Sequence, residues 1–117
     1  MMVFDLPYPP SLNALYRNAR GRTYLSKAGK DYKTTVAAIV QEANVEVITG
    51  RVSIAIQAHP PDRRKRDLDN ILKILLDSLE GQAFVNDSQV DYLQLERRHM
   101  IRGGKVFISV GNLDVSK

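Results

Sequence analysis

The chain has 117 residues, a formal net charge of +4 and 44% hydrophobic residues, and it contains no cysteine. This length predicts a single domain over residues 1–117, and the lack of cysteine excludes disulfide bonds and thiolate zinc sites. No apolar run approaches the roughly 20 residues that span a bilayer, and the first residues lack the form of a signal peptide. We therefore expect a soluble, cytoplasmic protein with no membrane partner.

The first third of the sequence predicts a strand, a long loop and a helix. Residues 2–6 form a short apolar segment, and a loop rich in Asn, Arg and Gly follows the Pro9-Pro10 pair. Long loops that carry aromatic and basic residues are commonly functional, so this one is interpreted as a binding loop. Ser26 is a suitable N-cap for a helix over 27–44, whose apolar residues recur at three- and four-residue steps.

The rest of the chain predicts three strands and a second helix. Residues 51–59 alternate between apolar and polar, as in a half-buried strand, and 69–80 show the clearest helical periodicity. After a turn at 86–88, strands are expected at 89–100 and 105–110. The order β-α-β-α-β-β predicts an α+β fold, in which two principal helices pack on a small mixed sheet.

Basic residues gather in two loop-like segments of the sequence. Clustered positive charge favours binding to a phosphate backbone, although a solvated charged surface explains such clusters about as well. Residues 16–33 and 60–66 form these segments. The candidate phosphate contacts among their cations are Arg17, Arg20, Arg22 and Lys27 in the first and Arg63, Arg64, Lys65 and Arg66 in the second.

Two aspartates, Asp67 and Asp69, stand at the start of the second predicted helix. Helix capping explains one aspartate, but two such carboxylates repel each other unless a cation lies between them. That cation is an arginine or a hard metal ion such as Mg²⁺ or Mn²⁺, with Asp87 or Asp91 as a candidate third ligand. Lys73 is suited to hold a phosphate or a water, or to form an ion pair with Asp69 one turn away.

The motifs PDRRKRDLDNILKILLDSL at 61–79 and NDSQVDY at 86–92, after PPSLN and RGRTYLS nearer the start, resemble a known family. They closely resemble the RusA-type endodeoxyribonucleases, which are Holliday junction resolvases of bacteria and their lambdoid phages. The resemblance extends over roughly residues 6–92. Its DRR.RDLDN core followed by a lysine is far more specific than an isolated pair of aspartates.

The resemblance implies an enzyme of recombination and DNA repair, a homodimer that uses Mg²⁺ or Mn²⁺ to nick opposed strands of a four-way junction. It implies Asp67, Asp69 and Asp87 as catalytic metal ligands and Lys73 as the essential lysine, while the basic residues of both segments would track phosphates. Asn86 stands where some relatives carry another acid. The sequence leaves open whether Asp87 joins the other two aspartates within one chain or across a dimer.

A different interpretation from the same residues is a non-catalytic basic DNA-binding module, such as a small phage regulator. In such a protein the aspartates would only cap a helix, and the cations would hold duplex DNA. Metal-dependent cutting of branched DNA separates the two interpretations.

Overall fold

A four-stranded mixed sheet forms the body of the protein in the computed structural model, which describes residues 2–113 except the side chains of residues 12 and 13. The strand order is β1-β6-β4-β5, in which β4 and β5 are parallel and the other pairs are antiparallel. β5 is therefore an edge strand. The strands are β1 (Met2–Leu6), β4 (Val52–His59), β5 (Val90–Arg97) and β6 (Lys105–Asn112).

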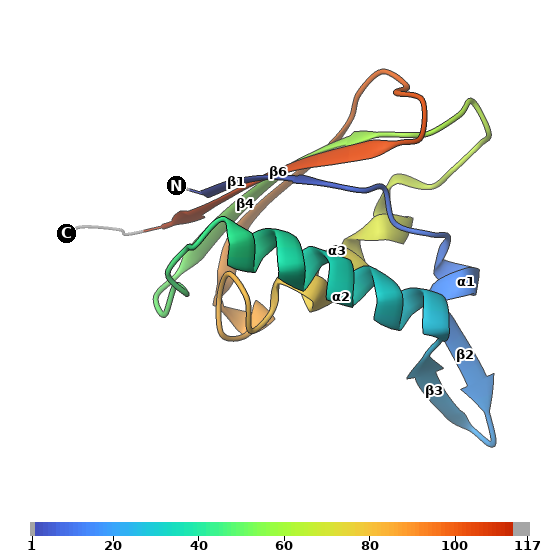
Figure 1. Ribbon diagram of the computed structural model, residues 1–117, viewed down its shortest axis with the longest axis horizontal. Helices are drawn as coiled ribbons and strands as arrows, with labels where there is room; N and C mark the ends of the chain where they lie inside the picture. The colour runs from blue at the N-terminus through green and yellow to red at the C-terminus, as the bar shows by residue number, and fades with distance from the viewer. Residues whose placement is uncertain (1, 114–117) are drawn as a thin grey trace.

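Two helices, α2 (Lys27–Glu42) and α3 (Leu72–Leu79), cover one face of this sheet, as Figure 1 shows. β4 illustrates why: its alternate residues Val52, Ile54 and Ile56 are buried against the helices, as the sequence pattern predicts. The same core takes in buried residues of both helices. The α+β fold with two helices on a mixed sheet is thus confirmed.

The start of α2 follows from two small residues. The Ser26 hydroxyl accepts a hydrogen bond from the Gly29 N–H at 3.2 Å, so Ser26 is the predicted N-cap. A Cβ on Gly29 would lie 2.6 Å from a Leu25 methyl group and 2.8 Å from the Leu15 carbonyl oxygen. Glycine in the first turn therefore lets α2 pack closely against the preceding segment.

The prediction of a long loop before α2 is wrong. That segment contains α1 (Leu12–Leu15) and a hairpin of β2 (Tyr16–Ala19) and β3 (Arg22–Leu25). The two residues at the hairpin tip, Arg20 and Gly21, both have positive φ angles, 52° and 74°. A two-residue turn of this kind matches the twist of the two strands. The hairpin extends away from the body of the protein (Figure 1).

The second helix differs from the prediction at its beginning. Residues Leu68–Ile71 form a 3₁₀ turn, η1, and the α-helix starts only at Leu72. The tighter turn changes which side chains share a helix face, because residues three apart eclipse each other in a 3₁₀ turn. Within residues 2–113, no helix has the length and apolar character needed to cross a membrane.

Candidate active site

Asp67 and Asp69 lie at the start of η1, and both are exposed. Asp67 occupies the N-cap position, but its side chain accepts no capping hydrogen bond there. Neither carboxylate forms an ion pair or a hydrogen bond with any other residue in the part of the chain that the structure describes. Helix capping therefore does not account for Asp67, and both carboxylates are available to a ligand.

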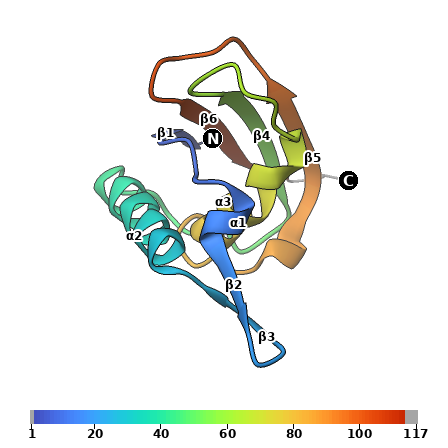
Figure 2. The same cartoon turned by 90° about the vertical axis from the view of Figure 1, so that its right-hand side faces the viewer.

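The two basic segments lie on either side of these aspartates. Figures 1 and 2 show the loop before η1 at one edge of this end of the molecule and the β2–β3 hairpin at the opposite edge. η1 and α1 lie between them, at the end that faces the viewer in Figure 2. One end of the protein thus presents exposed carboxylates between two groups of cations.

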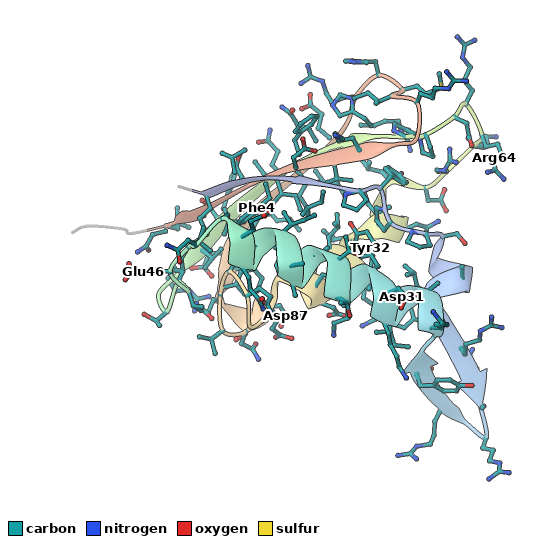
Figure 3. The ribbon with its side chains drawn as sticks, viewed as in Figure 1. Phe4, Asp31, Tyr32, Glu46, Arg64 and Asp87 are labelled. Carbon is teal, nitrogen blue, oxygen red and sulfur yellow. The ribbon has the colours of Figure 1, made fainter. Side chains whose placement is uncertain are left out.

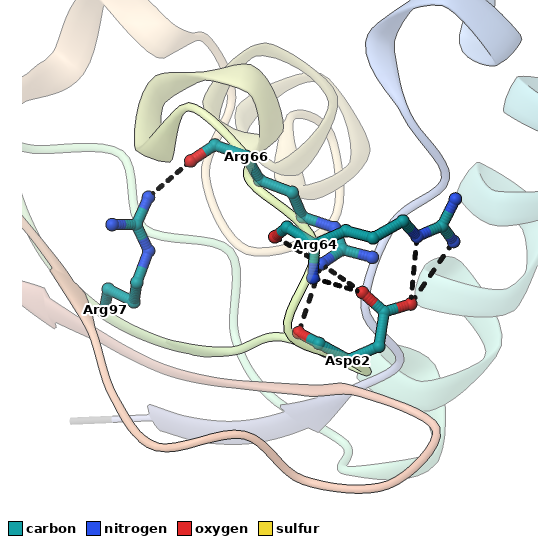
Figure 4. Close-up of polar contacts among 4 residues, drawn as sticks. All are labelled: Asp62, Arg64, Arg66 and Arg97. Atoms are coloured by element: carbon teal, nitrogen blue, oxygen red, sulfur yellow. Dashed lines mark hydrogen bonds and ion pairs between the residues drawn. The ribbon is translucent and has the colours of Figure 1, made fainter.

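The loop before η1 is held in place by its own ion pairs. Asp62 contacts both Arg64, at 3.2 Å, and Arg66, at 2.8 Å, and these contacts hold the pKa of the Asp62 carboxyl well below its usual range. Arg97, at the end of β5, donates a hydrogen bond to the Arg66 carbonyl oxygen at 2.6 Å (Figure 4). Two of the loop's cations therefore shape it, whereas its other two, Arg63 and Lys65, are exposed and form no ion pair within residues 2–113.

The hairpin carries the other predicted DNA-binding cations. Arg17, Arg20 and Arg22 are all exposed on β2, β3 and the turn between them. Lys27, at the start of α2, forms an ion pair of 2.9 Å with Asp31, one turn along the same helix. Its charge is therefore partly offset, while the three hairpin arginines form no ion pair within residues 2–113.

Lys73 is held by two residues that the sequence analysis did not single out for this role. Its ammonium group lies 3.3 Å from an oxygen of Asp77, one turn further along α3, and 5.2 Å from the centre of the Tyr16 ring. The Tyr16 hydroxyl donates a hydrogen bond to the same Asp77 oxygen at 3.0 Å. The expected ion pair between Lys73 and Asp69 is thus replaced by one with Asp77.

Asp87 lies in a short turn whose neighbouring side chains form hydrogen bonds that hold the turn together. Asn86 accepts a hydrogen bond from the Ser88 N–H, and Gln89 accepts one from the Asn86 N–H, so the two form a capping box. The Asp87 N–H donates to Glu80 at 3.0 Å, just after α3. These contacts leave the Asp87 carboxylate exposed to solvent.

Asp87 lies far from Asp67 and Asp69 within one chain. η1 and α3 separate them, and at the usual rise per residue these elements span about 20 Å. The eight residues of β5 run between the same two ends and span about 25 Å. Figure 3 labels Asp87 well away from Arg64, and within residues 2–113 no three His, Cys, Asp or Glu side chains are placed to share a metal ion.

Asp91, the other candidate third ligand, is already engaged. It forms an ion pair with Arg51, whose guanidinium group also donates to the Ser88 carbonyl oxygen at 2.8 Å. This pairing lowers the pKa of Asp91 below its usual value, chiefly through the hydrogen bond from Arg51. Asp91 therefore joins β5 to the start of β4 and is not an uncommitted carboxylate.

Comparison with known proteins adds an independent finding. Residues 7–111 match the family model described as Endodeoxyribonuclease RusA. The chain is 40% identical to the crossover junction endodeoxyribonuclease of Enterobacteria phage HK97 over 113 residues, which cover 95% of this chain and 94% of the relative. It is 38% identical to the protein of that name from Escherichia coli K12, over 90% and 89% of the two chains. The chain therefore belongs to the RusA family of endodeoxyribonucleases.

Proposed function

We propose that the protein is a metal-dependent endonuclease that resolves four-way DNA junctions by paired nicks, in homologous recombination and DNA repair. The observation that carries this proposal is the pair of uncommitted carboxylates at Asp67 and Asp69 between two groups of cations. Cations on both sides of an acidic site draw DNA strands toward it, although the carboxylates themselves repel phosphate. The names of the relatives, crossover junction endodeoxyribonucleases, support the same activity.

The residues fit a hard divalent cation. Two exposed carboxylates two residues apart offer the oxygen ligands that Mg²⁺ or Mn²⁺ prefers, and Mg²⁺ usually takes only one or two carboxylates together with waters and substrate oxygens. A bound ion would supply a water activated for attack on the phosphodiester and would neutralise charge on the leaving oxygen. Lys73, on the next turn, would hold the attacked phosphate through its ammonium group.

Asp87 joins this site only if it comes from a second subunit. Two carboxylates that bind one Mg²⁺ place their oxygens within about 4 Å of each other, since each lies near 2.1 Å from the ion. Within one chain the elements between Asp67 and Asp87 span about 20 Å, which is far larger. A homodimer in which Asp87 of one subunit approaches Asp67 and Asp69 of the other would complete two equivalent sites.

The edge strand β5 is suited to form that dimer. Its outer edge has no partner strand in the described sheet, and Tyr92 and Leu93 are 54% and 40% exposed. Asp87 precedes β5, whereas Arg97, at its other end, contacts the residue before Asp67. Antiparallel pairing of β5 with its copy would therefore bring Asp87 near the partner's active site. The two-fold symmetry of such a dimer matches that of a junction cut on two opposed strands.

The experiment that tests the function compares two DNA substrates. A four-way junction and a linear duplex of the same arm sequences, each end-labelled, are incubated with the protein in the presence and absence of Mg²⁺. The expected result is a pair of symmetric nicks in the junction that requires Mg²⁺, with the duplex left whole. Binding to both substrates without strand breaks would identify a DNA-binding module, and cutting of both would identify a general nuclease.

As an enzyme that acts on bacterial or phage DNA, the protein would work in the cytoplasm.

A further inference from the structure

A cleft of about 600 Å³ lies beside Asp67, between two segments far apart in the sequence. One wall is formed by Tyr8, Pro9 and Pro10, which connect β1 to α1. Asn70, in η1, lines the same cleft. The cleft thus combines flat apolar rings with a side-chain amide, and it lies beside the proposed site of strand cleavage.

The wall at Tyr8 is preformed by close backbone packing. A Cβ on Gly104, in the loop before β6, would lie 2.6 Å from the Tyr8 Cβ and 3.2 Å from the Pro61 Cβ. Only a glycine fits there, and it brings Tyr8 and Pro61 together without a side chain between them. Burial raises the pKa of the Tyr8 hydroxyl, although Arg66 opposes that shift. Because this packing at Gly104 holds Tyr8 in place, its ring does not need to move to receive a ligand.

Positive charge lies close to the Tyr8 ring. The Arg66 guanidinium group is 5.9 Å from the centre of the Tyr8 ring, and its ion pair with Asp62 fixes it there. Lys65 lines the same cleft and forms no ion pair in the described part of the chain. A ligand in the cleft would therefore meet apolar rings and cations together.

A nucleotide matches this combination better than a phosphate alone. Bases that leave their stack bind on aromatic and apolar side chains, and their edges form hydrogen bonds with amides such as Asn or Gln. The cations would contact the phosphates on either side of the base. Asn70 suits the reading of an edge, because its side chain forms no hydrogen bond with another residue among 2–113.

We infer that this cleft binds an unstacked base from the DNA strand whose phosphate is attacked at Asp67, with Tyr8 against the face of the base and Asn70 at its edge. The inference rests on the proposed function, because it takes the strand near Asp67 to be that of a branched DNA. It assigns to Asn70 the choice of base at the cut and to Tyr8 the affinity for a base of any kind.

The test measures whether the protein recognises a base at this position. A set of four-way junctions carries one abasic nucleotide each, at successive positions within a few nucleotides of the crossover. Their affinities are measured with the Asp69→Asn protein, which allows binding without cutting. One abasic position is expected to weaken binding about tenfold, the size of a base-stacking contact. In the Asp69→Asn/Tyr8→Ala protein this loss is expected to vanish, because the base then has no Tyr8 ring to stack on and its removal costs no affinity.

The Tyr8→Phe and Asn70→Ala changes complete the test. Tyr8→Phe retains the ring and is expected to retain the tenfold loss. Asn70→Ala is expected to keep the preference for a base over an abasic nucleotide but to bind all four bases at that position equally. It also carries the test if Tyr8→Ala unfolds, as circular dichroism would reveal. The inference would be overturned if all abasic junctions bound with equal affinity. It would also be overturned if the loss persisted without Tyr8 and the base preference persisted without Asn70.

The outcome is separable from that of the proposed function. A protein that loses tenfold affinity at one abasic position but never cuts a junction has the base-binding cleft without the nuclease activity. A protein that cuts junctions and is indifferent to every abasic position is a nuclease whose cleft binds no base.

Discussion

The Tyr16 hydroxyl donates a hydrogen bond to Asp77 at 3.0 Å, and this contact joins the basic hairpin to helix α3. The same Asp77 oxygen holds the Lys73 ammonium group at 3.3 Å. Because Asp77 is partly buried, its carboxylate fixes both partners more firmly than an exposed ion pair would. Tyr16 and Asp77 are therefore positioning residues for Lys73.

Replacing Tyr16 with Phe removes the hydroxyl and keeps the ring. We expect the cutting rate at saturating protein to fall about threefold to tenfold, because Asp77 loses a donor and Lys73 gains freedom to move. Junction affinity is expected to stay unchanged, which distinguishes a positioning role from a binding role. The matched change Tyr24→Phe, at an exposed tyrosine of the same hairpin, should leave both quantities at the parent values. Equal rates for Tyr16→Phe and the parent would remove Tyr16 from the site.

The hairpin arginines are expected to contact phosphates. Arg22→Gln should weaken junction binding for every arm sequence and reduce the slope of log affinity against log salt by about one unit. Arg20→Asn should act similarly, since Asn tolerates the positive φ of 52° at that position. Lys27→Gln should have a smaller effect, because Asp31 already offsets the Lys27 charge. Affinity measured between 50 and 200 mM salt tests this order, and unchanged slopes for all three proteins would exclude the hairpin from the DNA interface.

Asp91 is expected to contribute to stability and not to cutting. Because the pairing with Arg51 lowers the pKa of Asp91 below its usual value of 3.8, its contribution is present above that pH and is lost as the pH falls through the lowered pKa. The Asp91→Asn protein should therefore unfold more easily than the parent at pH 7, and the difference should narrow below pH 4. It should still cut junctions, which Asp87→Asn should not. Loss of cutting in Asp91→Asn with unchanged stability would show that Asp91 is a ligand after all.

Much of the fold is readable in the sequence because its signals are local. The stripe of apolar residues in α2 and the alternation in β4 each report burial within a few residues of chain. The hairpin was missed because its turn has Arg20 where Asn or Asp normally accompanies glycine, and an arginine with positive φ leaves no recognisable signal. The 3₁₀ start of the second helix was likewise hidden, since the apolar spacing fits either kind of helix.

The candidate site likewise has features that are local in the sequence and features that depend on the three-dimensional arrangement. The adjacency of Asp67, Asp69 and the basic loop is a property of one short segment, so the motif alone pointed to it. The contact between Tyr16 and Asp77 joins residues 61 positions apart, and no local pattern indicates it. The separation of Asp87 from the other two aspartates depends on the lengths of α3 and β5 in space. The sequence therefore identified the chemical groups but not their arrangement.

A mixture of two inactive variants tests whether the site is shared between subunits. Asp69→Asn and Asp87→Asn are each expected to be inactive alone. In a mixed dimer, one site receives both substitutions and the other receives neither, so co-expressed subunits should nick one strand of the junction. A mixture of Asp67→Asn with Asp69→Asn should remain inactive, because each subunit then disables its own site. If the first mixture fails to cut although the mixed dimer has been isolated, Asp87 acts within its own chain.

The most direct measurement compares binding and cutting of a labelled four-way junction by the parent, by Asp69→Asn and by Glu46→Gln, all with Mg²⁺. Asp69→Asn should bind the junction at least as tightly as the parent, since a negative charge near phosphate is removed, and should leave it uncut. Glu46→Gln removes one negative charge at an exposed position of the loop between α2 and β4, and it should cut at the parent rate. Cutting by Asp69→Asn at the parent rate, or a junction left whole by the parent itself, would contradict the account.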